Sequence, residues 1–451
     1  MINDSINTFD TSKTIEVLDS KSKETEKEKQ IKKTKINIYI KIIKIMIFVC
    51  FTLLGFINHL GYYLILTSSQ QFATKLGNES LIACYPLALI VFSSFTRIIN
   101  SKYCINISYF VRVISLAIYF FIGYLSLFFI LQNANISKNN NRAFWLTMIP
   151  TTIVGTAESF GEVTILGYAG TFRGNYISGW NIGSSFAGVC GSFLSLLFKR
   201  LKTNLKYIYL FLSPIAVLYL FIFMLIHLCG YKDRKNYIIK QKYNKMHEEK
   251  SQNIPNNNNI EITNKKDLNI KNLKEGFKVS YRYIINLSLI NFLQYTICYC
   301  FCERANKYKF INSKETYFES IQYETLLLFF ELGVVISNSF LFLIKNVKKL
   351  EIFTYLQIIN FIIWFFQSLF GIISNQWICY IHLFFVGICG GAGNTGFLYS
   401  MFNSKKISQR LQELCLNICE FFMDWGILIS SITSIIFDNT FMKTNEYKVK
   451  V

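Results

Sequence analysis

The chain has 451 residues, of which 52% are hydrophobic and 17% aromatic, and it carries a formal net charge of +20. This apolar content exceeds what a water-soluble domain needs, so the composition indicates an integral membrane protein. The charge does not indicate a nucleic-acid-binding protein, because Lys and Arg gather outside the apolar stretches instead of forming a basic stripe on a folded domain. The 12 cysteines lie within apolar segments and predict no disulfide framework.

The first 44 residues are polar, with ten lysines and seven acids. This composition is not that of a secretory signal peptide, and it predicts a disordered cytosolic tail at 1–44.

Eleven later stretches are apolar and long enough to cross a bilayer, because a helix rises about 1.5 Å per residue and the hydrocarbon core is about 30 Å thick. They cover residues 45–67, 80–97, 105–131, 144–170, 176–198, 207–230, 282–302, 321–344, 350–373, 376–402 and 411–437. With only four prolines in the chain, these stretches are expected to be mostly uninterrupted helices.

A polar insert at 231–281 divides the spans. It holds twelve Lys or Arg, six acids and a run of asparagines, which cannot bury a core, so it predicts a flexible cytosolic linker. The expected organisation is a six-helix bundle at 45–230, the linker, a five-helix bundle at 282–437 and a C-terminal tail at 438–451.

Most basic loops fall on one side if the N-terminus is cytosolic, as the positive-inside rule requires. The loop with Lys199, Arg200, Lys202 and Lys206 then falls on the lumenal side, against that rule. The N-x-S tripeptides at Asn78 and Asn135 also fall on the lumenal side and are candidate glycosylation sites.

Four groups of motif residues follow one another along the membrane portion. The first span has Cys50, Phe51, Leu53, Leu54, Gly55, Asn58 and Tyr62, and the third has Tyr109, Arg112 and Val113. The most specific stretch is Gly161-Glu162-Val163-Thr164, followed by Ala169, Arg173, Ser178, Trp180, Gly183, Ala187 and Gly188. Near the end stand Gly387, Gly390, Gly391, Ala392, Asp424 and Gly426. In order and spacing these motifs resemble the battenin family of lysosomal multi-pass proteins.

The resemblance implies a fold related to the major facilitator and equilibrative nucleoside transporters, with two six-helix-like bundles around a central cavity. It implies a lysosomal or vacuolar membrane, because battenins are linked to clearance of glycerophosphodiesters from lysosomes and, in fungi, to basic amino-acid and pH balance in the vacuole. The chain has Gln294 where the family has Glu, Asn338 where it has Arg and Val386 where it has Glu. These departures concern the substrate rather than the fold.

Five acids within predicted spans are candidate functional groups, because an ionisable group inside a span costs about 2.5–3.5 kcal/mol and usually faces a pathway or a partner. They are Glu158, Glu162, Glu331, Glu420 and Asp424. Glu158 and Glu162 are four residues apart, hence on one helix face, and their mutual repulsion makes one of them a candidate proton carrier. Glu162 is the stronger candidate because it belongs to the motif; Glu420 and Asp424 repeat the spacing in the other half. The alternative is that these acids accept hydrogen bonds and fix helix packing.

Basic and polar residues offer further candidates. Arg112 either extends to the membrane interface or pairs with a carboxylate. Arg173 either follows the positive-inside rule or takes part in gating, as its place in the motif implies. His59 either faces the substrate pathway or is a hydrogen-bonded packing residue. The remaining substrate candidates are Asn58, Tyr62, Trp180 and Gln294.

Small residues predict close contacts between helices, with gating as the alternative role. They include Gly183, Gly188, Gly191, Gly387, Gly390 and Gly391. Cys298, Cys300 and Cys302 do not have zinc-ligand spacing, so no metal and no cofactor is predicted. No catalytic motif is present, which argues against an enzyme.

The sequence therefore predicts an all-helical membrane protein with about 11 transmembrane helices in two pseudo-symmetric, major-facilitator-like bundles. Its expected function is alternating-access transport of a small polar metabolite, a glycerophosphodiester or basic amino acid, with protons and lipids as further partners. Two alternatives stay open. One is a non-transporting scaffold or trafficking regulator that binds cytosolic partners through residues 231–281; the other is a nucleoside transporter.

Overall fold

The computed structural model describes the chain at residues 11–104, 107–134, 140–172, 176–204, 206–231, 234–235, 270–307, 322–340, 349–373, 375–402, 404, 407 and 409–440. Only the backbone is described at 11–37, 101–102, 140, 270–272, 306–307, 402 and 409–413.

The first half of the described chain is a series of helices. They are α1 (Thr11–Lys75), η1 (Glu79–Leu81), α2 (Cys84–Ile90), α3 (Ser93–Lys102), α4 (Tyr109–Ala134), α5 (Asn140–Ala169), α6 (Tyr176–Arg200), α7 (Lys206–Leu212) and α8 (Ile215–Cys229). The expected second span is thus η1, α2 and α3 in succession, and the sixth is α7 and α8, interrupted at Ser213 and Pro214.

The second half repeats this construction. Its elements are α10 (Ile270–Thr296), η3 (Ile297–Phe301), α11 (Cys302–Lys307), α13 (Gln322–Ser339), α15 (Glu351–Phe370), α16 (Gln376–Phe402) and α17 (Gln409–Asn439). The short η3 is a π-helix, so the seventh span is α10, η3 and α11 in one line.

Nine helical stretches of the described residues are long and apolar enough to cross a membrane. The two remaining expected spans correspond to α5 and α13, which carry Glu158, Glu162, Glu324 and Glu331. Together they make the eleven expected crossings, and the fold is an all-helical membrane bundle as predicted.

Burial in this bundle differs from that in a soluble protein, because large apolar side chains also cover the outer surface and several polar ones are buried inside. Phe211, Val217 and Ile381 are each more than 60% exposed, whereas Ser68 and Gln357 are fully buried. An outer surface of large apolar side chains is suited to contact with lipid, because lipid tails do not exclude apolar groups as water does.

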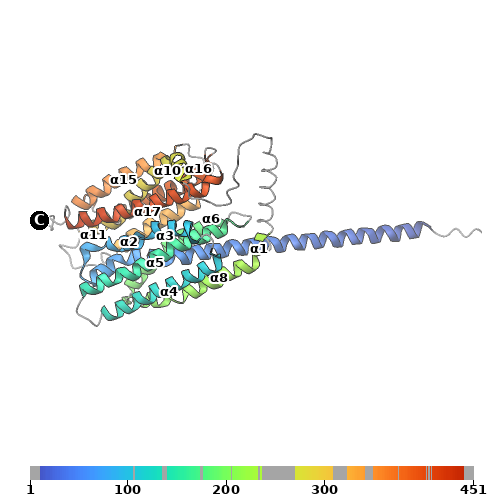
Figure 1. The fold of residues 1–451 in the computed structure, drawn as a ribbon, viewed down its shortest axis with the longest axis horizontal. Coiled ribbons are helices and arrows are strands. Elements are labelled where there is room, and N and C mark those ends of the chain that lie inside the picture. Colours follow the sequence, from blue (N-terminus) through green and yellow to red (C-terminus); the bar gives the residue numbers. More distant parts are fainter. Residues whose placement is uncertain are drawn as a thin grey trace, which may run out of the picture.

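The helices pair in the same way in both halves. In the first half α1 packs against α6, and α5 against α2, α3 and α4; in the second half α10 packs against α17, and α16 against α13 and α15. Figure 1 shows α10, α15, α16 and α17 together on one side of the bundle and α4, α5 and α8 on the other. This repeated pairing is the pseudo-symmetry that the sequence predicted.

The halves meet along two lines of contact. In the first seam α2 and α3 pack against α17, and in the second seam α6 packs against α13. Each seam therefore joins the second helix position of one half, α2 with α3 or α13, to the fifth position of the other, α17 or α6, so relative movement of the halves changes the packing at the seams.

Glycine permits the closest helix approaches. A Cβ added at Gly183 would lie 1.9 Å from the backbone oxygen of Thr52 on α1, and one at Gly387 would lie 2.1 Å from that of Phe330 on α13. No larger residue fits without moving a backbone, which agrees with the packing role expected for small residues in bilayers.

Two boundaries differ from expectation. α1 is helical from Thr11 and projects well beyond the bundle (Figure 1), although the sequence predicts disorder at 1–44. Lys is the commonest residue of this stretch, and Lys and Glu are good helix formers, so a helix already formed by the first span extends through it. α10 begins at Ile270, inside the predicted linker, for the same reason at its Lys-rich and Leu-containing start. The central part of the linker, 236–269, and the tail from 441 lie outside the described residues.

Candidate functional site

Arg97 on α3 is held by three carboxylates from two other helices. Its Nη2 lies 2.8 Å from Glu162 Oε2, its Nη1 lies 2.7 Å from Glu420 Oε2, and its Nε lies 2.9 Å from Asp424 Oδ2. The Arg97 side chain is only 8% exposed. All three nitrogens of the guanidinium fork thus engage an acid, which is the geometry for which arginine is suited.

Local sequence explains why these groups meet. Ser93 and Arg97 lie four residues apart on α3, and Glu420 and Asp424 lie four apart on α17, so each pair occupies one helix face. Glu162 reaches the same point from α5, which packs against α3. This Arg97 cluster, made of Arg97, Glu162, Glu420 and Asp424, therefore lies at the first seam.

Hydrogen bonds extend the cluster toward α1. Ser93 Oγ donates to Asp424 Oδ2 at 2.6 Å, and Ser159 Oγ lies 2.6 Å from Ser93 Oγ and 3.1 Å from Glu158 Oε2. Glu158 Oε1 lies 3.0 Å from His59 Nε2. A continuous polar path thus connects α17, α3, α5 and α1 through the buried interior.

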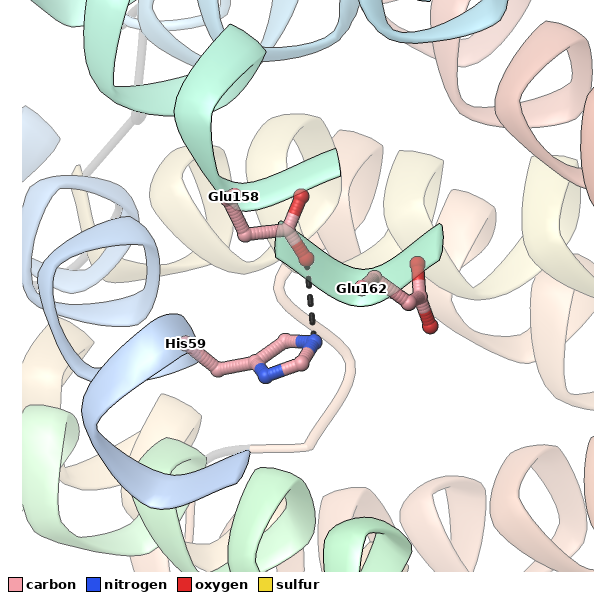
Figure 2. A group of neighbouring side chains, drawn as sticks. All are labelled: His59, Glu158 and Glu162. Atoms are coloured by element: carbon pink, nitrogen blue, oxygen red, sulfur yellow. Dashed lines mark ion pairs between the residues drawn. The ribbon is translucent and has the colours of Figure 1, made fainter. Parts of the chain in front are cut away.

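His59 and the two acids of α5 form the end of this path. Figure 2 shows the imidazole of His59 facing the carboxylate of Glu158, with Glu162 one turn farther along α5. These three residues each offer a ligand atom within 4.8 Å of the others. A metal ion there would have to displace His59 Nε2 from Glu158, while His59 Nδ1 is engaged by Gly55 O at 2.9 Å. The group is therefore an ion-paired cluster and not a preformed metal centre.

Other predicted residues support this region. Asn58 Nδ2 donates to the backbone oxygen of Glu158 at 2.9 Å, and the ring of Trp180 lies edge-on to His59 at 5.5 Å. Tyr62 is buried on α1, in edge contact with Tyr63. Asn58 and Trp180 thus position His59 and Glu158 through contacts with α5 and α6.

Five predicted residues lie elsewhere or outside the described chain. Gln294 Nε2 donates to Asn291 at 2.9 Å and its Oε1 packs on Gly390, within the second half. Arg112 donates to the backbone oxygen of Ile107 at 2.9 Å and lies over the Tyr109 ring. Arg173 and the sequon residue Asn135 are outside the described residues. Asn78, between α1 and η1, is partly exposed.

The glycine candidates all make close contacts. Gly188 packs on Glu331, Gly191 on Tyr63 and Gly391 on Ser337. These contacts account for their packing; their role in gating stays a prediction.

The sequence prediction does not include Arg97 among the charged groups inside the membrane, because it ends the second span at residue 97. The described span continues to Asn100, which places Arg97 one turn inside the apolar stretch. A second span longer by one turn would include Arg97 inside the membrane, where an arginine requires a partner.

The second seam has its own ion pair. Lys199 Nζ on α6 lies 2.8 and 2.9 Å from the two carboxylate oxygens of Glu324 on α13, whose side chain is fully buried. Gln71 on α1 also donates to Glu324, at 3.0 Å. Lys199 therefore neutralises a buried acid, which gives a structural reason for a lysine that departs from the positive-inside rule in the predicted topology.

Comparison with known proteins adds three findings. The CLN3 protein family model matches residues 49–444. The chain is 25% identical over 410 residues to battenin of Dictyostelium discoideum, covering 87% of this chain and 94% of that protein. It is 24% identical over 405 residues to protein BTN1 of Kluyveromyces lactis, covering 88% and 94%.

Solved transporters share the fold at low sequence identity. A D-xylose-proton symporter superposes with a TM-score of 0.58 at 12% identity, covering 90% of this chain and 92% of that one. A POT family transporter in complex with 5-aminolevulinic acid gives 0.54 at 14%, covering 88% and 90%. The nucleoside transporter NupG gives 0.52 at 15%, covering 86% and 90%. Since sugar, nucleoside and POT family transporters all match, the fold does not select a cargo.

Proposed function

The chain belongs to the CLN3 protein family, and from that premise we propose that it transports a small polar metabolite across a lysosomal or vacuolar membrane by alternating access. Its transporter-like fold and family argue for a membrane protein that binds a small molecule within a lipid environment, and against an enzyme. Beyond this, we propose that transport is by alternating access, that it is coupled to protons, and that the cargo and the membrane are those of a lysosome or vacuole.

The buried polar path at the first seam carries the proposal. It contains four carboxyl groups, one guanidinium and one imidazole. Even with His59 charged, acids outnumber cations two to one. Excess negative charge in a low-dielectric interior is costly, so the path favours binding of protons or of a cationic group of the cargo.

Alternating access follows from the position of this path. The Arg97 cluster ties α3 and α5 to α17, and Lys199 ties α6 to Glu324 on α13. When the halves rock, one seam must open while the other holds. A charged group that changes protonation alters the strength of one seam and so shifts the equilibrium between the two orientations.

Glu162 is the carboxylate we assign to proton coupling. Its side chain is 21% exposed, compared with 12% for Glu420 and 7% for Asp424. Water therefore reaches Glu162 first when the first seam loosens. A proton on Glu162 removes one of the three anions around Arg97 and so alters the charge balance that joins α3 and α5 to α17 at the first seam.

The cargo we propose is a glycerophosphodiester or a basic amino acid, with an effect on vacuolar pH through the coupled proton. Both classes are small and polar, and a basic amino acid or a cationic headgroup would offset the excess of carboxylates. Membership of the family supports these classes, whereas the three departures at Gln294, Asn338 and Val386 lie in the second half, away from the Arg97 cluster.

Two measurements test transport and cargo. Metabolites of vacuoles isolated with and without the protein are compared first; loss of the protein should raise the vacuolar content of one class. Uptake of labelled glycerophosphocholine and arginine into proteoliposomes under a pH gradient then tests transport directly. If neither probe moves and vacuolar metabolites are unchanged, the transport proposal is wrong.

A further inference from the structure

Glu331, near the middle of α13, is a buried acid that the Arg97 cluster does not include. It is 5% exposed and has no hydrogen bond or ion pair to any residue that the structure describes. Glu162, Glu420 and Asp424 pair with Arg97, Glu324 pairs with Lys199, and Glu158 contacts the imidazole of His59. Glu331 therefore differs from them in lacking a counter-charge.

The groups around Glu331 are neutral. Tyr63 of α1, Tyr295 of α10 and Cys298 of η3 face it closely enough to interact electrostatically. Phenol and thiol groups are uncharged near neutral pH. Among the described residues, α6, α11 and α16 present no titratable group to it, and α6 contributes Gly188. An ionised carboxylate in this setting would be unpaired, so the group must hold a proton or a cation.

The close packing around Glu331 favours a proton over a larger cation. A Cβ at Gly188 would lie 2.2 Å from Glu331 Oε2, so the carboxyl group packs directly on the backbone of α6. No ammonium group or hydrated metal ion fits between the two helices at this contact. A proton neutralises the carboxylate without needing volume.

The spacing of α13 connects this group to the second seam. Glu324, Glu331 and Asn338 follow at intervals of seven residues and so lie along one helix face. Glu324 pairs with Lys199 and Asn338 donates to Ser185 at 2.7 Å, both on α6. Glu331 sits between these two contacts, so separation of α13 from α6 would expose it to water.

We propose that Glu331 is a proton-binding site that holds the second seam closed when protonated and favours its opening when ionised. This inference rests on the proposed alternating access, and adds a second protonation site to the one assigned to Glu162. Low pH protonates Glu331 and favours the closed second seam. A rise in pH removes the proton and favours the open second seam.

Infrared difference spectroscopy of the full chain in lipid nanodiscs tests the site without a substrate. A pH jump should give a carbonyl band of a protonated carboxyl group. The band should be absent in Glu331→Gln, shifted in Glu331→Asp and unchanged in Glu351→Gln, whose acid pairs with Arg282 at the partly exposed start of α15. The Asp variant gives a result even if the Gln variant does not fold. An unaltered band in both Glu331 variants would overturn the proposal.

Hydrogen exchange of the α13 peptide tests the effect on the seam. In the wild type, the protection factor of residues 322–339, which corrects for the intrinsic rise of amide exchange with pH, should fall several-fold when the pH is raised, whereas that of Glu331→Gln should stay unchanged. The same pH response in the variant would contradict the proposal. Neither readout depends on transport. If glycerophosphocholine and arginine are not taken up but the carbonyl band responds to the Glu331 substitutions, only the transport proposal is wrong. If uptake occurs but the band is the same in the wild type and in both Glu331 variants, only the proposal of a proton site at Glu331 is wrong.

Discussion

The first seam surrounds one guanidinium with three carboxylates, whereas the second seam pairs one lysine with one glutamate and leaves Glu331 without a counter-charge among the described residues. The first seam has an excess of negative charge around one arginine. The second seam has one balanced ion pair and, separately, Glu331, which is neutral when it is protonated. The difference shows that corresponding helix positions in the two halves need not carry the same chemistry. The pseudo-symmetric fold therefore has two seams of different charge balance, and under the proposed mechanism their strengths respond differently to protonation.

Removing Arg97 should break the first seam and gives the largest expected effect. Arg97→Gln leaves three acids facing one another in a buried site, which should destabilise the protein by about 3–5 kcal/mol. Thermal unfolding of the purified protein in lipid measures this change. Arg282→Gln, which removes the mostly exposed partner of Glu351, is the control and should change little. Equal unfolding temperatures for the two variants would mean that the Arg97 cluster does not stabilise the fold.

The second seam should show strong coupling between its two charged partners. Lys199→Gln leaves Glu324 buried and unpaired and should cost about 1–3 kcal/mol, less than the loss of Arg97 because Lys199 is partly exposed. Adding Glu324→Gln should recover part of the loss, since the unpaired charge is then removed.

A double-mutant cycle on thermal unfolding checks this pair. Additive losses in the double variant would show that Lys199 and Glu324 do not act together, and the second seam would then lack its ionic contact.

Shortening the linker should leave both seams unchanged and gives the smallest expected effect. Deleting residues 240–268 stops before α10 begins at Ile270. A transporter should keep its flux and its vacuolar metabolite profile, because the described carboxylate partners of Arg97 and Lys199 all lie on helices of the bundle. Loss of the cellular phenotype with normal flux in proteoliposomes would favour the scaffold alternative, in which cytosolic partners bind the linker.

Most of the fold could be predicted from the sequence because apolar length is a local property. The eleven crossings, the division into halves and the pair spacings of Glu158 with Glu162 and Glu420 with Asp424 all follow from residues within one or two turns. The start of α10 could not, because a polar, Lys-rich stretch is compatible with either a linker or a helix that continues a span.

The site was predicted only in part, since ion pairing is a long-range property. The sequence identified the acids, but not that Glu162 and Asp424 share Arg97, since their partners lie 65 and 327 residues away along the chain. The sequence alone also does not show that Glu331 has no partner among the described residues, because that depends on the packing of α6 on α13. Arg97 was missed for a local reason, a span ended one turn too early.

The most direct test of the central claim, that carboxylates between the halves couple protons to transport, is uptake by proteoliposomes containing Glu162→Gln. The wild type should accumulate the labelled probe, glycerophosphocholine or arginine, against its gradient when a pH difference is imposed. The variant should accumulate at least about tenfold less probe than the wild type, a difference of about 1.4 kcal/mol, while still exchanging probe across the membrane. Accumulation by Glu162→Gln equal to that of the wild type would contradict the account.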